Sequence, residues 1–308
     1  MRSDLLHVVC AVANPMRWDS RLRLYRAFEA HMLDSGVRLT TVECAYGDRD
    51  FEVADSRHVN VVRVRANGAQ MIWNKENLLN LGIARLPEAK YIATVDADVF
   101  FRKRYWAAET VHELQHHCVV QPWSDCYDLG PHDEHLAVHR SFCRLVFDGE
   151  PMQMVHKAPY RFGHPGYAWA WRRGTLDALG GLIEMAALGA GDHHMALAMI
   201  GKADRSLPGG IHPNYRQAVM AWQERATAHV AGNIGHVDGT IEHRWHGTKE
   251  RRRYVGRWEI LTRHRYDPVV DLKRNVFGVV ELAGNKPGLR LDVHRYFHAR
   301  DEDSNSLG

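Results

Sequence analysis

Two aspartates, Asp96 and Asp98, directly follow an apolar stretch at residues 91–95. We expect that stretch to be a strand, which places both carboxylates at the carboxyl edge of a sheet, where open α/β folds bind ligands. Carboxylate oxygens suit Mg²⁺ or Mn²⁺, and a divalent ion held there would neutralise the charge of a phosphorylated ligand. Alternatively, the aspartates only form the turn at a solvent-exposed strand end.

Other residues that could take part in catalysis or metal binding lie later in the chain. Asp192 follows a glycine-containing loop and begins a predicted helix. Because the helix dipole and free backbone amides stabilise a carboxylate at that position, capping alone would explain it. Histidine is frequent, with 21 residues, and His243 and His246 lie close together late in the sequence. In such a chain, any single histidine can be a surface or packing residue.

The elements that must position these residues are clearest in the first 125 residues. Short β-rich runs alternate there with longer amphipathic patterns, which predicts an α/β protein with a mostly parallel sheet flanked by helices. We predict strands at residues 5–12, 37–43, 58–64 and 91–95, and helices at residues 20–33 and 74–86.

The second half of the chain is less regular. Residues 125–162 are rich in His, Asp and Pro with weak periodicity, so we expect long functional loops there. Further along, we predict strands at residues 167–171 and 235–245, helices at residues 189–200 and 214–229, and a basic helix at residues 249–264.

Composition excludes several classes of protein. The chain has 308 residues, of which 45% are hydrophobic and 25% charged, as in globular proteins with a sizeable core. The formal charge of +3 does not by itself indicate a nucleic-acid or membrane partner. Five scattered cysteines without a CxxC pair disfavour a disulfide framework and a zinc site, and no apolar run is long enough to span a membrane. We therefore expect a cytoplasmic protein, or one in the host cytoplasm if a phage encodes it, without integral membrane association.

Three blocks of sequence are more specific when taken together. They are WNKENLLNLG at residues 73–82, YIATVDAD at residues 91–98, and GYAWAWRR with the later LGGL and GAGD at residues 166–192. In their order and spacing they resemble the GT-A-fold glycosyltransferases, in particular the beta-galactosyl and N-acetylgalactosaminyl transferase group, of phage or bacterial type. The resemblance covers approximately residues 5–246. It implies a Rossmann-like GT-A sheet with a smaller acceptor-side sheet and loops.

The resemblance also implies a metal site. In the related group, the acidic motif binds a divalent ion, and a late histidine completes the site, so we assign Asp96, Asp98, His243 and His246 to the metal. Of the two histidines, His243 is the first choice. Imidazole together with carboxylate ligands favours Mn²⁺, with Mg²⁺ as the alternative.

Asp192 becomes the candidate general base, which would take the proton from the acceptor hydroxyl as the sugar is transferred. Here the sequence departs from the family's motif. That motif usually carries two consecutive acidic residues, whereas the second one here is His193. Either residue can therefore be the base, since histidine has a suitable pKa.

The donor implied by the resemblance is a UDP-sugar. Arg17 or Arg21 could pair with its diphosphate, and Glu43 or Asp48, after the second strand, could contact uracil or ribose. The alternative is that Asn14 and Pro15 only end the first strand and that the arginines form a solvated helix face. The full set of residues assigned to the nucleotide-sugar is Asn14, Pro15, Arg17, Arg21, Glu43, Asp48, Asn74, Lys75, Asp96 and Ala97.

Aromatic residues are the candidates on the acceptor side. Tyr167, Trp169 and Trp171 alternate along a predicted strand, so they share one face, where they could be core or could stack on a sugar ring. Gly166 precedes them in a loop that could approach a ligand closely, and Trp123 lies earlier in the chain, after the strand predicted at residues 91–95. We assign Trp123, Gly166, Tyr167, Trp169 and Trp171 to the acceptor.

The acceptor itself stays open at this point. Residues 249–258 mix cations with aromatic side chains, which suits a nucleic acid, so one alternative is a hydroxymethylated base in phage DNA. The other is a saccharide or glycolipid of an envelope pathway, with no role for DNA. In both cases transfer is predicted to be direct and inverting. A catalytically silent protein that binds nucleotide-sugars is a further alternative, which the presence of Asp98 and Asp192 disfavours.

We predict one glycosyltransferase domain over residues 1–300. Its nucleotide-binding half comprises residues 1–125, its acceptor-side half residues 126–248, and a basic helix with a C-terminal segment residues 249–300. Residues 301–308 are polar and are predicted to form a flexible tail.

Overall fold

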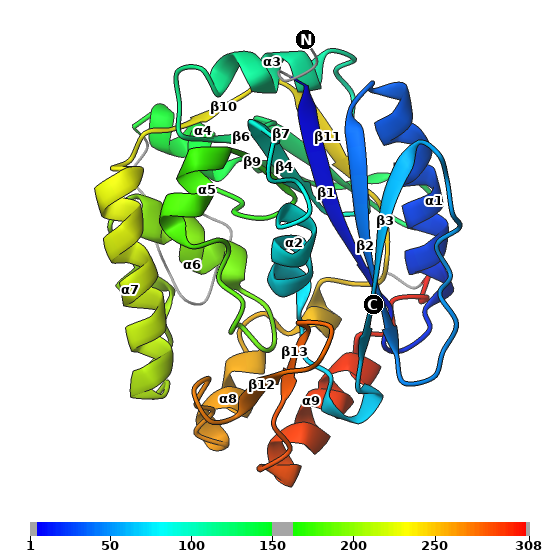
Figure 1. The fold of residues 1–308 in the computed structure, drawn as a ribbon, viewed down its shortest axis with the longest axis vertical. Helices are drawn as coiled ribbons and strands as arrows, with labels where there is room; N and C mark the ends of the chain where they lie inside the picture. The colour runs from blue at the N-terminus through cyan, green and yellow to red at the C-terminus, as the bar shows by residue number, and fades with distance from the viewer. Residues whose placement is uncertain (1–4, 150–162, 306–308) are drawn as a thin grey trace.

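A seven-stranded sheet forms the centre of the computed structural model, which describes residues 5–149 and 163–305 (Figure 1). Its strand order is β10-β6-β9-β4-β1-β2-β3. Strand β9 runs antiparallel to both of its neighbours, and the other neighbouring pairs are parallel. The predicted α/β class with a mostly parallel sheet is confirmed. The strands are β1 (Leu6–Ala13), β2 (Arg38–Tyr46), β3 (Val59–Ala66), β4 (Tyr91–Val95), β6 (Val119–Gln121), β9 (Ala168–Arg172) and β10 (Ile234–His236).

A smaller sheet lies beside the central one, with the order β5-β11-β7-β8. Strand β11 pairs antiparallel with β5 and parallel with β7, so it lies between them. The remaining two strands, β12 and β13, form a separate antiparallel pair. The strands are β5 (Val99–Phe101), β7 (Asp125–Leu129), β8 (His135–Arg140), β11 (Thr240–His243), β12 (Leu272–Arg274) and β13 (Val280–Leu282).

Helices cover both faces of the central sheet, because each strand carries buried apolar side chains on both sides. On one face, α1 (Asp19–Asp34) and α3 (Trp106–Glu113) pack in the same core as Val8. On the other, Val9 shares a core with α2 (Lys75–Ile83). That second core also includes α5 (Arg173–Leu179), α6 (Gly191–Met199), α7 (Pro213–His229), α8 (Arg257–Arg263) and α9 (Pro287–Ala299).

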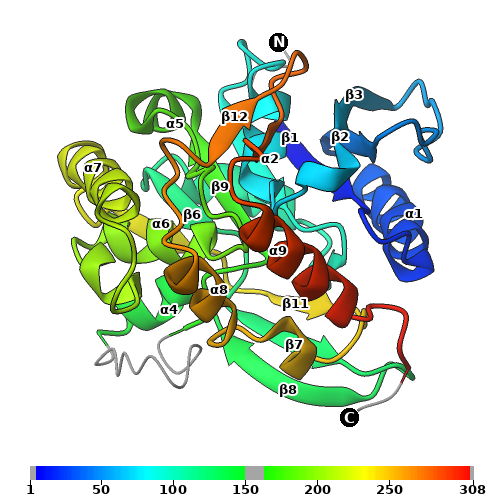
Figure 2. The ribbon, with the colours of Figure 1, turned by 90° about the horizontal axis from the view of Figure 1, so that it is seen from below.

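Helices α8 and α9 pack together below the carboxyl edge of the sheet (Figures 1 and 2). The other short helices are α4 (Phe142–Phe147), η1 (Gly68–Gln70), η2 (Ala203–Ser206) and η3 (Glu250–Arg252). No helix in residues 5–149 and 163–305 is both long and apolar enough to cross a membrane.

Three predictions for the second half of the chain were wrong. Residues 125–149 contain β7, β8 and α4 rather than long loops; residues 150–162 lie outside the described part. The single strand predicted at residues 235–245 is divided by a turn into β10 and β11, which belong to different sheets. The basic helix predicted at residues 249–264 is interrupted at Arg253, whose φ of 44° ends η3 before α8 begins.

The predicted flexible tail is also wrong over residues 301–305. The Glu302 side chain is buried there, and both carboxylate oxygens of Asp303 accept hydrogen bonds, from the backbone amides of Asp19 and Ser20 at the start of α1. A carboxylate that binds free amides at a helix N-terminus is a capping interaction. This segment is therefore anchored to the fold. Residues 306–308 lie outside the described residues.

Helix α2 lies unusually close to the sheet at Gly82. A Cβ atom at this position would lie 2.5 Å from Cγ1 of Val9 and 2.7 Å from Cγ2 of Val42. Both valines are fully buried, so neither side chain has free space into which it can move. The glycine therefore sets the distance between α2 and strands β1 and β2.

We predict that Gly82→Ala lowers the free energy of unfolding by about 1–3 kcal/mol, because the added methyl group overpacks this contact. Urea denaturation of the two proteins measures the difference. Gly174→Ala in α5 is the matched control, since a Cβ there meets no atom within 4 Å and should cost no stability. Equal stability of the Gly82→Ala protein and the wild type would contradict the close packing.

Candidate functional site

A cavity of about 470 Å³ opens at the carboxyl edge of the central sheet. It lies where β1 and β4 end and where α2 and α6 begin, and residues around α8 and α9 form its other side. This is the edge at which α/β folds bind ligands. Most of the residues predicted from the sequence line this cavity: Pro15, Arg21, Asn74, Lys75, Asp96, Ala97, Asp98, Gly166, Tyr167, Asp192, His193, His243 and His246.

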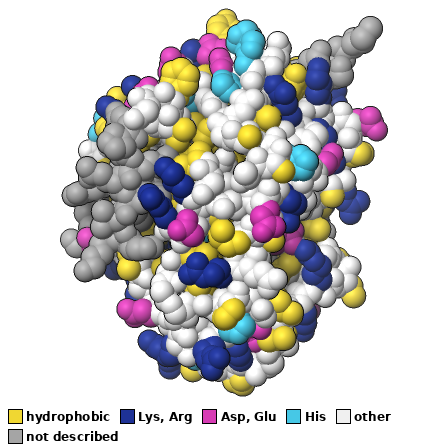
Figure 3. Space-filling view, turned by 90° about the vertical axis from the view of Figure 1, so that its left-hand side faces the viewer, with side chains coloured by type: hydrophobic (Ala, Val, Ile, Leu, Met, Phe, Trp, Pro, Cys, Tyr) yellow, Lys and Arg dark blue, Asp and Glu magenta, His cyan; other side chains and the backbone are white. Residues whose placement is uncertain are grey.

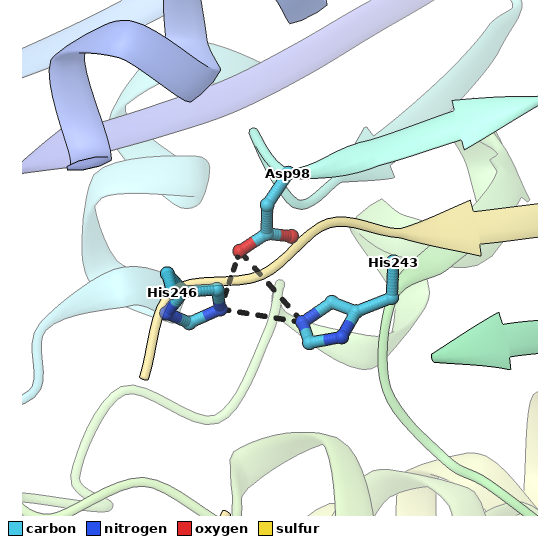
Figure 4. Close-up of side chains that lie close together, drawn as sticks. All are labelled: Asp98, His243 and His246. Carbon is cyan, nitrogen blue, oxygen red and sulfur yellow. Dashed lines mark hydrogen bonds and ion pairs between the residues drawn. The ribbon is translucent and has the colours of Figure 1, made fainter. Parts of the chain in front are cut away.

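Three of these residues converge on one point. Asp98, His243 and His246 point toward one another (Figure 4), and one ligand atom from each lies within 4.8 Å of the other two. The Nε2 atom of His246 is 3.0 Å from Oδ2 of Asp98 and 3.2 Å from Nε2 of His243. Nitrogen and carboxylate ligands in this arrangement suit a divalent transition metal.

Strand pairing brings Asp98 and His243 together. In the antiparallel pair of β5 and β11, His243 lies opposite Val99, the residue after Asp98. The pairing continues past the strand end, because the Arg244 amide donates to the Asp98 carbonyl at 2.9 Å. Residues far apart in the sequence are therefore held side by side by backbone hydrogen bonds.

Each imidazole is oriented by a second carboxylate behind it. Nδ1 of His243 lies 3.0 Å from Oδ1 of Asp128, and Nδ1 of His246 lies 3.2 Å from Oε2 of Glu302. A carboxylate favours the proton on Nδ1, which leaves the lone pair of Nε2 for a metal. Burial lowers the pKa of His243 to about 4, so this ring is neutral at pH 7.

The Asp98 carboxylate completes the set of ligands. Its Oδ1 atom is buried and has no hydrogen-bond partner among the described residues. A buried carboxylate oxygen without a partner is costly, and a metal ion would satisfy it. Together with the Nε2 atoms of His243 and His246, Asp98 fits the Mn²⁺ or Mg²⁺ site that the sequence predicted.

Asp96 is held apart from this cluster. Its Oδ1 atom accepts from Nζ of Lys75 at 3.0 Å, so the first carboxylate of the acidic motif pairs with the first residue of α2. Burial alone would lower the pKa of Lys75, but Asp96, Glu76 and Asp192 raise it above its ordinary value. Lys75 is therefore charged and in the cavity.

Asp192 occupies the first turn of α6 on the cavity wall. Its Oδ1 atom accepts from the adjacent His193 backbone amide at 2.8 Å. The N-cap of α6 is Ala190 and the helix has no side-chain cap, so Asp192 is not the capping residue. The neighbouring Gly166 backbone approaches closely, since a Cβ there would lie 3.0 Å from Oδ2 of Asp192.

Arg252 is a cavity residue that the sequence did not single out. Its side chain is buried, with Nη2 3.1 Å from Nε2 of His246 and Nη1 3.3 Å from the Tyr254 hydroxyl. Among the described residues, it has no carboxylate partner within ion-pair distance, and its Nε has no hydrogen-bond partner. A buried guanidinium without a carboxylate at ion-pair distance, beside Asp98, His243 and His246, favours an anionic ligand in this cavity.

Four of the residues assigned to the nucleotide do not line the cavity. Arg17 and Asp48 are exposed. Glu43 is buried within β2, where its Oε1 accepts from the amide of Val53 at 3.1 Å and anchors a loop. The Asn14 side chain binds both backbone groups of Trp18 and so closes the turn after β1.

Three of the tryptophans assigned to the acceptor are core residues. Trp123 and Trp171 are 0% and 1% exposed, so their rings cannot stack on a sugar. Trp169 is 5% exposed and its indole donates to the Pro165 carbonyl at 2.7 Å. Tyr167 differs, because its φ of 75° turns it out of the pattern of the following strand and its hydroxyl donates to Asp128 at 2.9 Å.

Asp128 is the second residue that sequence reasoning missed. It accepts hydrogen bonds from His139, Tyr167 and Lys249 in addition to its contact with His243. Burial opposes its charge, but these neighbours hold the pKa of Asp128 far below its ordinary value. Its role follows from strand register, because β7 pairs with β11 and places Asp128 opposite His243.

Comparisons of the sequence with known protein families and with curated proteins find no match. In fold, the chain is similar to nucleotide-sugar transferases of the GT-A type. A complex of Drosophila beta1,4-galactosyltransferase 7 with xylobiose is 13% identical, with a TM-score of 0.33 and coverage of 66% of this chain and 62% of that one. A mutant of the same enzyme, in complex with manganese, UDP-Gal and xylobiose, is 12% identical, with a TM-score of 0.35 and coverage of 66% and 63%.

A third similar structure is glucosyl-3-phosphoglycerate synthase from Mycobacterium tuberculosis, in complex with Mn²⁺, UDP and phosphoglyceric acid. It is 12% identical, with a TM-score of 0.37 and coverage of 85% of this chain and 75% of that one. The matched region spans less than two thirds of the length of the two Drosophila chains.

Glu76 gives this site a measurable pH dependence. Burial raises the pKa of Glu76 to about 7, with Lys75 opposing and Asp192 adding to the shift. The pKa of Glu76 in the folded protein exceeds its pKa in the unfolded chain. The contribution of protonated Glu76 to the free energy of unfolding is therefore complete below about pH 4.5 and is lost as the pH rises through 7. We predict that wild-type stability falls between pH 5 and pH 8 relative to Glu76→Gln, by up to about 3 kcal/mol.

Urea denaturation in metal-free buffer at both pH values measures this difference. Glu224→Gln, at an exposed position of α7, is the matched control and should follow the wild type. If the stability of Glu76→Gln and of the wild type changes in parallel with pH, the buried carboxylate does not titrate in this range.

Proposed function

We propose that this protein is a metal-dependent glycosyltransferase that moves a sugar from a UDP-sugar donor to a hydroxyl acceptor. The observation that carries the proposal is the convergence of Asp98, His243 and His246 beside a buried Arg252, all in one cavity. Three candidate metal ligands and a guanidinium that has no carboxylate at ion-pair distance among the described residues suit a ligand that is itself an anion, such as a nucleoside diphosphate.

In this proposal Asp98, His243 and His246 hold Mn²⁺, or alternatively Mg²⁺. When bound, the ion neutralises the charge that develops on the departing diphosphate. Asp128 keeps His243 in the orientation that presents Nε2 to the site, through the 3.0 Å contact to Nδ1. Asp96 instead fixes the position of the Lys75 ammonium group.

The cations on the cavity wall bind the diphosphate. Arg252 has donors that no described carboxylate uses, and Lys75 reaches the cavity from the start of α2. A guanidinium and a divalent cation so close together repel each other unless an anion lies between them. A diphosphate can bind both groups. The nucleoside would then occupy the part of the cavity next to Pro15 and Asn74.

On the acceptor side, Asp192 takes the proton from the attacking hydroxyl, and His193 is the alternative base. Both residues line the cavity. The sugar passes directly from the diphosphate oxygen to the acceptor oxygen, with inversion and without a covalent enzyme intermediate. Tyr167 and Gly166 are the remaining predicted acceptor residues on the cavity wall.

The basic residues after β11 favour a saccharide over DNA as the acceptor. Lys249 binds Asp128, Arg252 points into the cavity, and Arg257 donates to the Leu188 carbonyl at 2.9 Å. Lys249 and Arg257 are thus bound within the protein and Arg252 faces the cavity, so these three cations do not form an exposed row for phosphates. On the face that carries α7, basic side chains are likewise scattered among acidic and apolar ones (Figure 3). The acceptor assay described below therefore includes hydroxymethylated DNA as the alternative acceptor.

We predict that Asp98→Asn loses Mn²⁺ binding and metal-dependent turnover of UDP-sugars while keeping its fold, since Asp98 lies in the turn between β4 and β5. Calorimetric titration with Mn²⁺ and release of UDP measure the two effects, and circular dichroism checks the fold. Asp204→Asn, at an exposed position of η2, is the matched control and should behave as the wild type. Full activity of Asp98→Asn in chelator-treated protein would refute the metal assignment.

The acceptor and the base can be identified in one assay. The protein is incubated with UDP-glucose, UDP-galactose or UDP-N-acetyl sugars and either a saccharide or hydroxymethylcytosine or hydroxymethyluracil DNA. The molecular masses of the products are then measured by mass spectrometry. We expect a gain of one sugar on the saccharide; a gain on the DNA nucleoside would select DNA. Asp192→Asn should lower transfer by about 10²–10⁴-fold and His193→Gln should not, and the reverse result would make His193 the base.

A further inference from the structure

The C-terminal segment is part of the cavity region rather than an appendage. After α9, residues 301–305 return to the loop that carries His246 and to the start of α1 (Figure 2). The Trp245 indole donates to the Ser304 carbonyl at 2.7 Å. Gly247, with a φ of 81°, lets the two segments touch, because a Cβ there would lie 2.9 Å from the Asp301 carbonyl oxygen.

Glu302 is the residue of this segment that reaches the metal ligands. It is 1% exposed, and Arg21 contacts both of its carboxylate oxygens, whereas Arg300 and His246 each contact one of them. Oε1 accepts from Nη2 of Arg21 at 2.9 Å and from Nε of Arg300 at 2.7 Å. Oε2 lies 3.2 Å from Nδ1 of His246 and 2.7 Å from Nε of Arg21.

We propose that Glu302 is a positioning residue that holds His246 as a metal ligand. The proposal rests on the metal site of the proposed function. A carboxylate that accepts from Nδ1 fixes the tautomer and the ring orientation, and it makes Nε2 a stronger ligand. Burial opposes the charge of Glu302, but Arg21, Arg300 and His246 hold its pKa well below the ordinary value, so it is ionised.

The arrangement at His246 matches the one at His243. In both cases Nδ1 contacts a buried carboxylate and Nε2 points toward Asp98. Asp128 comes from a neighbouring strand, whereas Glu302 comes from the end of the chain. The Oε2 atom of Glu302 therefore contacts both Arg21, at 2.7 Å, and Nδ1 of His246, at 3.2 Å.

The test is the affinity of the whole protein for Mn²⁺, measured by calorimetry without nucleotide. We expect Glu302→Gln to bind Mn²⁺ about 10–100-fold more weakly than the wild type, since that is the usual effect of removing a carboxylate behind a ligand histidine. Glu302→Asp should recover part of the loss. Asp303→Asn is the matched control, because it loses the cap of α1 but has no contact with His246. It should melt at a lower temperature with Mn²⁺ affinity unchanged.

Unchanged Mn²⁺ affinity of Glu302→Gln would overturn the role of Glu302 and leave the metal site standing. A wild type that binds no Mn²⁺ would overturn both. If Glu302→Gln unfolds because two arginines are left unpaired, Glu302→Gln combined with Arg21→Met reduces that charge excess. Weak Mn²⁺ binding by the folded double variant supports the proposal, and wild-type affinity refutes it.

Discussion

The antiparallel pairing of β5 with β11 is the constraint on which the site depends. It sets His243 opposite Val99, so the turn that carries Asp98 cannot move without moving the histidines. The same strand, β11, pairs on its other side with β7 and thereby brings Asp128 up behind His243. Two hydrogen-bonded registers thus fix one metal ligand, its neighbour and its supporting carboxylate. Backbone pairing fixes such positions more rigidly than a loop would, as a preorganised site requires.

His246 lies beyond the end of β11 and lacks this support. Its position is instead determined by Asp98 in front and by Glu302 behind. The chain terminus also caps α1 through Asp303, which connects the metal region to the first helix of the nucleotide side. Arg21, one turn into α1, binds the same Glu302. The first and last parts of the chain therefore meet beside the cavity and contact each other there.

The first half of the fold could be predicted because its signals are local. Strands β1 to β4 are buried apolar runs, and α1 and α2 carry amphipathic patterns with recognisable ends. The motifs then located Asp98, His243 and Asp192 in the cavity. What could not be predicted depends on contacts between distant segments. The polar residues 301–305 have the composition of a tail, and only packing against His246 and α1 orders them. Likewise, no local pattern shows that Arg252 is buried or that Trp171 lies in the core.

The balance of charge in the cavity explains why so many ionisable groups can be buried together. Glu302 compensates Arg21 and Arg300, Asp96 compensates Lys75, and Asp128 compensates Lys249. Each of these carboxylates thus has its cationic partner within the protein, and Glu302 is shared by two arginines. Arg252 and the cluster of Asp98, His243 and His246 differ, since the Arg252 guanidinium has no carboxylate at ion-pair distance among the described residues and Oδ1 of Asp98 has no hydrogen-bond partner there. A metal ion alone would satisfy Asp98 but add positive charge beside Arg252, and an anion alone would satisfy Arg252 but repel Asp98. The cavity is therefore complementary to the two together, which means that metal and diphosphate should each strengthen the binding of the other.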